Sequence, residues 1–302
     1  MLSTDFALGA PNWVDLGTPD VEAAAAFYRA LFGWEFEPAG PQAGGYGFFV
    51  LDGRTVAAAG PPTEEGATPA WTLYFGTSDA DAAAKAVETA AGTVRVPPTD
   101  VFDAGRMAHF TDPTGADFAV WQPRATRGLD TVAAPGALCW TELYTTDATA
   151  ARDFYRTVFA WTFRDVPMGP GLSYATFSPA GDGPHGEQGG IFQLLQDNLD
   201  AGSASEWHPY FAVTDCDIAF ATATGHGATT LIPPMDAPGV GRLAMLTDPA
   251  GAVFALLTPR AGADGLSPGP PAPAAFSRTC CACSKRASVQ SASTPPRSSS
   301  GA

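Results

Sequence analysis

Positive charge is scarce in this sequence. Its 302 residues include 16 lysines and arginines against 31 aspartates and glutamates, which gives a formal net charge of −15 at pH 7. Because phosphate groups repel a strongly negative protein, this balance disfavours binding to nucleic acids and to anionic membranes. The charge indicates solubility, and it does not point to a particular substrate.

Signals for membranes and for several common enzyme classes are also lacking. No apolar run is long enough to cross a bilayer, and the first residues do not combine a basic stretch with an apolar one. We therefore expect a cytoplasmic protein. The sequence contains no GxSxG nucleophile elbow, no phosphate-binding P-loop and no dinucleotide-binding fingerprint.

Cysteine is sparse, with five residues. Cys139 and Cys216 stand alone in apolar segments, which is typical of core residues. Cys280, Cys281 and Cys283 crowd together, but zinc-binding pairs usually have two to four intervening residues, and no second Cys or His pair follows. This cluster is weak evidence for a metal.

The cluster lies in a C-terminal segment of different composition. Residues 261–302 are rich in Pro, Ser, Gly and Ala and end in SASTPPRSSSGA. Such a segment cannot bury enough apolar surface to offset the entropy lost on ordering. We predict a disordered tail, and we expect truncation after Arg260 to leave the melting temperature unchanged.

The rest of the chain is a duplication. Residues 96–124 align without gaps with residues 232–260, and fifteen of the twenty-nine positions are identical. Upstream, NWVDLGTPDVEAAAAFYRALFGWEF (12–36) pairs with CWTELYTTDATAARDFYRTVFAWTF at a smaller shift, so the second copy carries about nine extra residues. We place them in the glycine-rich stretch GDGPHGEQGG. A period this long indicates a duplicated domain, not a solenoid.

Each copy has an internal rhythm as well. Thr18, Pro19 and Asp20 form a helix start after a short strand, apolar residues then recur at helical spacing, and Gly33 ends the helix. A DPTG turn precedes the last strand. The pattern predicts an α+β fold in which each half contains two βαβββ units. The strands expected in the first half are 13–16, 34–37, 46–51, 54–59, 71–75, 93–97, 105–111 and 116–121.

The paired βαβββ units, the FYR helix and the DP.G turn resemble the vicinal oxygen chelate superfamily, which includes glyoxalase I, extradiol dioxygenases and bleomycin-resistance proteins. The tandem arrangement, with W.DL or W.EL opening each half, is similar to actinobacterial two-domain glyoxalase-like proteins that are often labelled hydroxylases. The resemblance implies two tandem glyoxalase-like domains with curved mixed sheets, residues 10–124 and 136–260, joined by a linker, 125–135. The fold hosts lyases, oxygenases and non-catalytic binders, so it does not choose among them.

The metal ligands that this resemblance implies are mostly missing. Metal-dependent members carry His, Gln or Glu at four strand positions per site. At the fifth-strand position the second half has His208, a residue type that can bind a metal, whereas the first half has Thr72. Because a divalent metal needs about three or more protein ligands, we expect no cofactor, with a divalent metal as the alternative. The first-strand and last-strand positions hold Trp13, Trp140, Ala119 and Ala255.

Two carboxylates stand near these positions. Asp15 and Glu142 follow Trp13 and Trp140 by two residues, so each acid shares a strand face with its tryptophan. The indoles would turn a metal cup into an apolar, stacking pocket. Glu142 could meet His208 in one concave site, where a His beside a carboxylate can hold or move a proton near neutral pH. The alternative is a structural role for both acids.

Arginine is repeated at one position of each half. Arg106 and Arg242 follow glycines at the start of matching strands. One hypothesis is that they line the cavity and hold a carbonyl or carboxylate group. The other is a structural ion pair with the nearby Asp112 or Asp248.

Two functions remain open at this point. The first is a small-molecule-binding protein with degenerate metal positions, similar to bleomycin-resistance proteins. The second is a glyoxalase-type lyase or isomerase, or an oxygenase or hydroxylase, acting on a small carbonyl or aromatic metabolite with Glu142 and His208 as catalytic residues. We expect the two halves to pack as an intramolecular pseudo-dimer, so that the protein is a monomer whose partner is a small molecule. The ligand-binding residues would be Trp13, Asp15, Arg106, Trp140 and Arg242.

Overall fold

The computed structural model describes residues 2–64, 66–168, 172–180 and 186–260. The predicted tail, with its three clustered cysteines, lies outside these residues. Among the described helices, none combines the length and the apolar character that crossing a membrane requires. Cys139 and Cys216 are buried free thiols, as expected for core residues.

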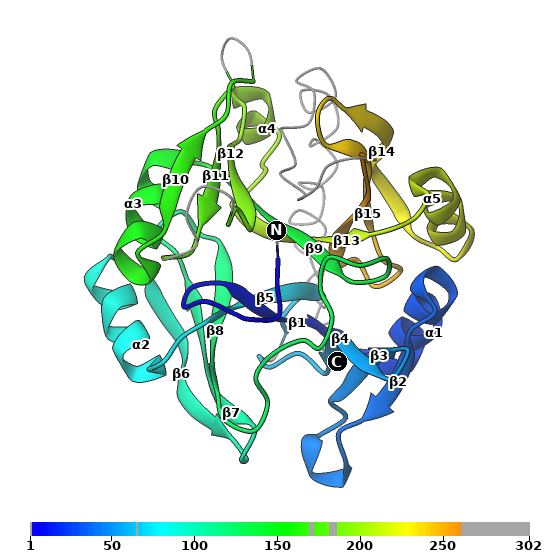
Figure 1. Ribbon diagram of the computed structural model, residues 1–302, viewed down its shortest axis with the longest axis horizontal. Coiled ribbons are helices and arrows are strands. Elements are labelled where there is room, and N and C mark those ends of the chain that lie inside the picture. Colours follow the sequence, from blue (N-terminus) through cyan, green and yellow to red (C-terminus); the bar gives the residue numbers. More distant parts are fainter. Residues whose placement is uncertain (1, 65, 169–171, 181–185, 261–302) are drawn as a thin grey trace, which may run out of the picture.

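The first half forms one eight-stranded mixed sheet (Figure 1). Its strands lie in the order β2-β3-β4-β1-β5-β8-β7-β6, so the two βαβββ units join where β1 and β5 pair antiparallel. The elements in chain order are β1 (Pro11–Gly17), α1 (Val21–Phe32), β2 (Glu35–Pro38), η1 (Pro41–Ala43), β3 (Gly47–Leu51), β4 (Arg54–Gly60), β5 (Ala70–Gly76), α2 (Ala80–Thr89), β6 (Thr93–Val101), β7 (Gly105–Thr111) and β8 (Asp117–Pro123).

The second half repeats this sheet with the order β10-β11-β12-β9-β13-β16-β15-β14. The predicted α+β fold of four βαβββ units is therefore confirmed. The glycine-rich stretch lies partly outside the described residues. The extra length of this half is not confined to it, because the short helix α4 after β12 has no counterpart among the described residues of the first half. The elements are β9 (Leu138–Thr145), α3 (Ala148–Phe159), β10 (Thr162–Asp165), β11 (Tyr174–Ser178), β12 (Gly189–Gln193), α4 (Gln196–Asp200), β13 (Glu206–Ala212), α5 (Cys216–Gly225), β14 (Thr229–Ala237), β15 (Gly241–Thr247) and β16 (Val253–Pro259).

The long helices all begin in the same way. An aspartate precedes each helix, and its carboxylate accepts a hydrogen bond from a backbone N–H of the first turn, which satisfies a donor that the helix itself cannot pair. Gly33 ends α1 in the left-handed conformation, with φ 76°. The four capping residues are Asp20, Asp79, Asp147 and Asp215.

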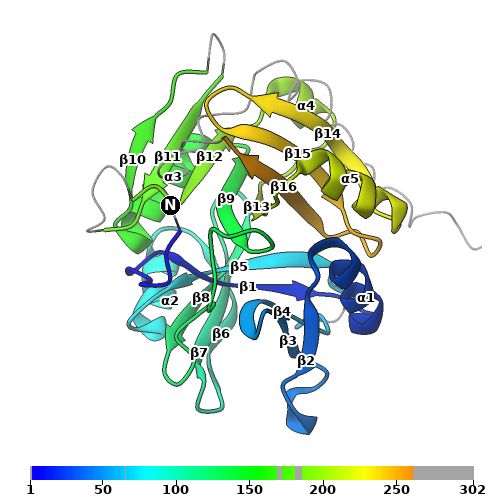
Figure 2. The ribbon, with the colours of Figure 1, turned by 45° about the vertical axis from the view of Figure 1, so that its right-hand side comes forward.

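The two halves pack through the faces that carry these helices. Helix α1 lies against α5 and α2 against α3, an arrangement that both ribbon views show (Figures 1 and 2). One hydrophobic core cluster extends across both halves, and a second one, which includes Trp140 and Tyr210, lies within the second half. The Phe75 ring, for example, lies 5.1 Å from that of Trp161 and 5.2 Å from that of Trp207 in the other half. The chain thus forms the intramolecular pseudo-dimer that its duplication suggests.

Reciprocal hydrogen bonds mark the pseudo-twofold relation. The Tyr28 hydroxyl of α1 donates to Asp248 across the interface at 3.2 Å, and Tyr155 of α3 donates to Asp112 at 3.0 Å. Each hydroxyl also accepts an indole N–H, from Trp71 and Trp207 respectively. The repeated FYR and DP.G motifs therefore supply a reciprocal pair of hydrogen bonds between the halves.

Candidate functional site

The concave face of the first sheet encloses a cavity of about 660 Å³, called the cup below. Both edges of the sheet contribute to it: the β2–β3 connection supplies residues 39–43 and the β6–β7 turn supplies residues 101–104. The sheet therefore curves until its opposite edges border one space. The side chains from the strands and their immediate flanks are Trp13, Asp15, Tyr46, Phe48, Tyr74, Met107 and Trp121.

Aromatic rings form the walls of the cup. The indole of Trp13 stacks on Trp121, with ring centroids 6.4 Å apart and an interplanar angle of 23°, and meets the Phe48 ring edge to face. Its Nε1–H donates to the Tyr46 hydroxyl at 3.0 Å. The predicted stacking position is therefore occupied by an indole, but its N–H is already used within the protein.

Whereas Asp103 lies in the β6–β7 turn, Asp15 is the carboxylate that the strands place on the floor of the cup. Its Oδ2 accepts hydrogen bonds from the hydroxyls of Tyr46, at 3.0 Å, and Tyr74, at 2.9 Å. No other described residue hydrogen-bonds this carboxylate, so Oδ1 remains for a ligand. Burial raises the pKa of Asp15 to about 6, although the two tyrosine hydrogen bonds act in the opposite direction. Near neutral pH the group is therefore close to the point where it can either accept or donate a proton.

A histidine lies behind this group. The Nε2 atom of His109 on β7 is 3.1 Å from the Tyr74 hydroxyl, and burial lowers the pKa of the imidazole. His109 also borders a separate cavity of about 370 Å³ between the halves, which has charged walls that include Arg95, Asp117 and Glu206. Desolvation, together with the nearby Asp117, raises the pKa of Glu206 to about 7. Asp15, Tyr74 and His109 thus form a hydrogen-bonded chain from the cup to a polar space.

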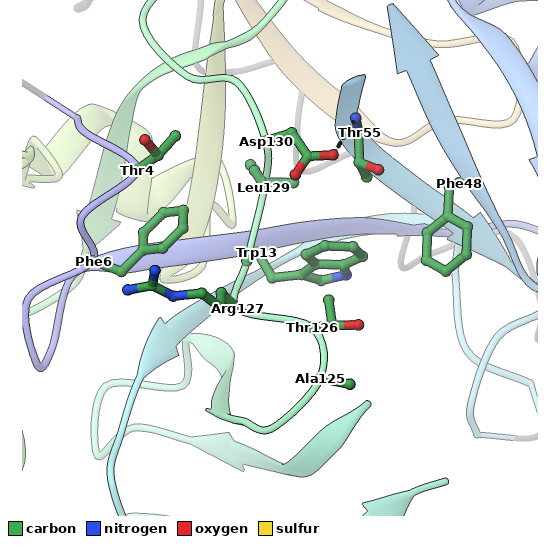
Figure 3. Close-up of a pocket in the computed structure, with 11 residues that line it drawn as sticks. Thr4, Phe6, Trp13, Phe48, Thr55, Ala125, Thr126, Arg127, Leu129 and Asp130 are labelled. Atoms are coloured by element: carbon green, nitrogen blue, oxygen red, sulfur yellow. Dashed lines mark hydrogen bonds between the residues drawn. The ribbon is translucent and has the colours of Figure 1, made fainter. Parts of the chain in front are cut away.

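A further hollow adjoins the cup on the side of the N-terminal segment. It measures about 580 Å³, and Trp13 and Phe48 line it as well (Figure 3). Residues 125–130, predicted as part of a linker, form one of its walls, and Asp130 accepts a hydrogen bond from the Thr55 N–H at 2.9 Å. A Cβ on Gly128 would lie 2.5 Å from the Phe6 ring, so only glycine allows this close approach.

The second half repeats the acid and its tyrosines. Glu142 accepts a hydrogen bond from the hydroxyl of Tyr210 and is also hydrogen-bonded by Tyr144 and Tyr174. The indole N–H of Trp140 donates to Tyr174 at 3.3 Å. Both halves therefore build a group of one tryptophan, one acid and two tyrosines at equivalent positions: Trp13, Asp15, Tyr46 and Tyr74 in the first, and Trp140, Glu142, Tyr174 and Tyr210 in the second. Tyr144 is a third tyrosine at the acid of the second half.

The structure brings Glu142 and His208 together, but without a hydrogen bond between them. The two residues are direct partners on β9 and β13, and each is only 2% exposed. Among the described residues, Nδ1 of His208 finds no hydrogen-bond partner. Burial lowers the pKa of His208 to about 3 and raises that of Glu142, so the imidazole is neutral at physiological pH.

The two arginines lie outside the cup. Arg106 immediately precedes Met107 on β7, and because successive side chains of a strand alternate, its guanidinium lies on the face of helix α2. There it pairs with Asp81 at 3.1 Å and Asp100 at 2.9 Å. Arg242 pairs in the same way with Asp217 and Asp236. Both arginines form surface ion pairs, with partners other than Asp112 and Asp248.

The donors of the cup do not suit a divalent metal. The positions that the resemblance implies as metal ligands hold Trp13, Thr72 and Ala119, and among the described residues Asp15 is the carboxylate on the cup floor. Within the described ranges, no group of three His, Cys, Asp or Glu side chains is placed to hold a metal ion. A divalent metal needs about three protein ligands, so Asp15 alone would leave about two of them to be supplied by residues outside the cup floor.

The tyrosines are the residues that the sequence reading missed. Tyr74 and Tyr210 stand at equivalent positions of the repeat, on the same strand face as Thr72 and His208. The repetition of a tyrosine at this position in both halves, together with the repetition of the acids Asp15 and Glu142, could have indicated these contacts. Tyr46 carried no such signal, because it lies where the two halves change register.

Comparison with known proteins identifies the family. The Glyoxalase/Bleomycin resistance protein/Dioxygenase superfamily matches residues 10–120, and a glyoxalase-like domain matches residues 140–257. The chain belongs to this superfamily. It is 41% identical over 277 residues to the anthracycline biosynthesis protein DnrV of Streptomyces peucetius, a match that covers 86% of this chain and 96% of that protein. It is 38% identical over 261 residues to CFP32 of Mycobacterium tuberculosis, provisionally named a glyoxylase, covering 85% and 97%.

Solved structures show the same fold at low identity. The Mn(II)-bound glyoxalase from Novosphingobium aromaticivorans aligns with a TM-score of 0.55 at 16% identity, covering 83% of this chain and 82% of that one. The 2,3-dioxygenase LapB from Pseudomonas sp. KL28 aligns with a TM-score of 0.57 at 13% identity, covering 86% and 97%. These likenesses establish the architecture of this glyoxalase-superfamily protein. They do not identify its chemistry, which has to be inferred from the residues of the site.

Proposed function

We propose that this glyoxalase-superfamily protein binds a flat, largely apolar small molecule in the cup of its first half. The observation that carries the proposal is the open carboxyl oxygen Oδ1 of Asp15, on the floor of an aromatic-walled cavity. A volume of about 660 Å³ lies within the usual range for small-molecule sites. The stacked indoles favour a planar ligand, and Oδ1 favours one that carries a hydroxyl or N–H group.

The relatives support a narrower ligand class. Two Streptomyces relatives, DnrV and DauV, are named for anthracycline biosynthesis. Anthracyclines are planar, fused-ring molecules with phenolic hydroxyls, which match both the aromatic walls and the hydrogen-bonding group of the cup. We infer that the ligand is a hydroxylated polycyclic aromatic compound.

Catalysis is the second candidate, and Asp15 is the observation that favours it. A carboxyl group with a pKa of about 6 can take a proton from a bound molecule near neutral pH. Tyr74 and His109 lie behind it in a hydrogen-bonded chain that could return that proton. Glyoxalase-type proton transfer on a carbonyl or aromatic metabolite would use these residues. Glu142 and His208 of the second half are proposed as a second catalytic site.

The assembly and surroundings of the protein remain predictions. We infer that one chain is the functional unit, because the contact between its halves is already made within the chain. A net charge of −15 supports small-molecule binding over nucleic-acid binding. A cytoplasmic location stays the expectation from the sequence.

The test is a titration with alizarin, a dihydroxylated anthraquinone, followed by quenching of tryptophan fluorescence. We expect D15N to weaken binding about tenfold, since an amide cannot supply the carboxylate, while it can still accept the tyrosine hydrogen bonds. The matched variant in the other half, E142Q, should bind like the parent. Absence of binding by the parent, or a loss with E142Q and none with D15N, would refute the proposed site.

A further inference from the structure

Phe102 combines features that the fold does not require. It is 65% exposed, it occupies the turn between β6 and β7, and its φ is +47°. That conformation is uncommon for a residue with a bulky side chain, because the Cβ crowds the backbone. An exposed aromatic ring in a strained turn is unfavourable for the isolated protein on both counts.

The other half shows that this turn can be made without strain on a bulky residue. The equivalent connection between β14 and β15 has the same length, but Phe102 corresponds to Pro238 there, and the left-handed conformation falls one residue later, on Gly239, with φ 82°. Glycine adopts this conformation at no steric cost. The aromatic residue at position 102 is therefore not needed to connect the two strands.

The position of Phe102 beside the cup offers a functional reason for its exposure. It lines the cup from the β6–β7 edge of the sheet, whereas residues 39–43 line the cup from the opposite edge. Trp13 and Trp121 form the wall further inside. We propose that Phe102 covers the planar ligand at the mouth of the cup, and that the strain in its turn is retained because it holds the ring there. This inference rests on the function proposed above.

The experiment separates strain from binding. Replacing Phe102 with glycine removes the strain, so F102G should raise Tm by about 2–4 °C. The same change removes the cover, so the affinity for alizarin should fall about tenfold. An ordinary destabilising mutation would move Tm and affinity in the same direction. F102Y, which keeps the aromatic ring, should retain the parent affinity and Tm.

Ala91 supplies a matched control. It has a φ of +64° after helix α2 and does not line the cup. A91G should therefore raise Tm as F102G does, with no change in alizarin affinity.

The outcomes distinguish the two hypotheses. If the parent binds alizarin and F102G binds equally well, or if F102G fails to raise Tm, the role of Phe102 is refuted and the cup remains a binding site. If the parent does not bind alizarin, the proposed function and the role of Phe102 fall together.

Discussion

At the scale of single residues, the protein maintains an acid in a place where its charge is unfavourable. Asp15 has a pKa of about 6 in the folded chain, against 3.8 for an unperturbed aspartate. The folded state therefore binds more protons than the unfolded state between about pH 4 and pH 6, and its free energy of unfolding falls as the pH rises through that window. A group that costs stability without structural need is typical of a functional site.

D15N should remove this dependence. We expect the variant to match the parent at pH 4 and to be more stable by roughly 2–3 kcal/mol at pH 8, because an amide carries no charge to desolvate. Urea unfolding at several pH values measures the difference. D5N, at an exposed position, serves as the control and should follow the parent at every pH. Equal stability of D15N and the parent at pH 8 would contradict the unfavourable burial of Asp15.

The sequence could predict part of this site. The spacing of two between Trp13 and Asp15 places both on one strand face, and the structure has them both lining the cup. The partners of Asp15 could not be predicted, because Tyr46 and Tyr74 come from strands that are distant in sequence. Hydrogen bonds between such strands depend on register, which no local pattern specifies.

At the scale of elements, each repeated motif serves a contact. The tyrosine of FYR projects from a helix to the aspartate of the other half's DP.G turn. In the sequence these motifs are part of the resemblance to the family. In the structure their side chains form hydrogen bonds between the two halves. The same alternation rule that placed Asp15 correctly also removes Arg106 from the cup, because Arg106 lies one position out of phase with Met107.

The interface tyrosines give a matched pair of variants. Y28F removes the donor to Asp248 and leaves the indole N–H of Trp71 without its acceptor. Because these groups are buried, we expect a loss of about 1–3 kcal/mol in the free energy of unfolding. Y155F should cost a similar amount by the same loss at Asp112. Thermal and urea unfolding test both, and wild-type stability for either variant would argue against a structural role for these hydrogen bonds.

At the scale of the whole molecule, duplication lets the two halves differ. The helix-bearing faces of the two halves pack in a shared core, while Trp140, Tyr174 and Tyr210 of the second half belong to a separate cluster. Side chains around the acid of one half can therefore change without altering those around the acid of the other. His109 in the first half corresponds to Met245 in the second, and Thr72 corresponds to His208. The fold and its pseudo-symmetry were predictable from the repeat. The half that holds the described cup was not, since both halves carry a tryptophan and an acid.

The interface predicts how the molecule behaves when it is divided. Cutting the chain between Ala134 and Pro135 would separate residues 1–134 from residues 135–302. Each piece alone would expose the aromatic face that now forms the common core, and it would lose the indole hydrogen bonds from Trp34 to Gly136 and from Trp161 to Gly9. A large exposed apolar surface favours association. We therefore expect the separate pieces to aggregate or self-associate, and the two pieces expressed together to purify as a one-to-one complex. Light scattering and co-purification measure this. If each piece is a stable, cooperatively unfolding monomer by itself, the shared core does not bind the halves into one folding unit.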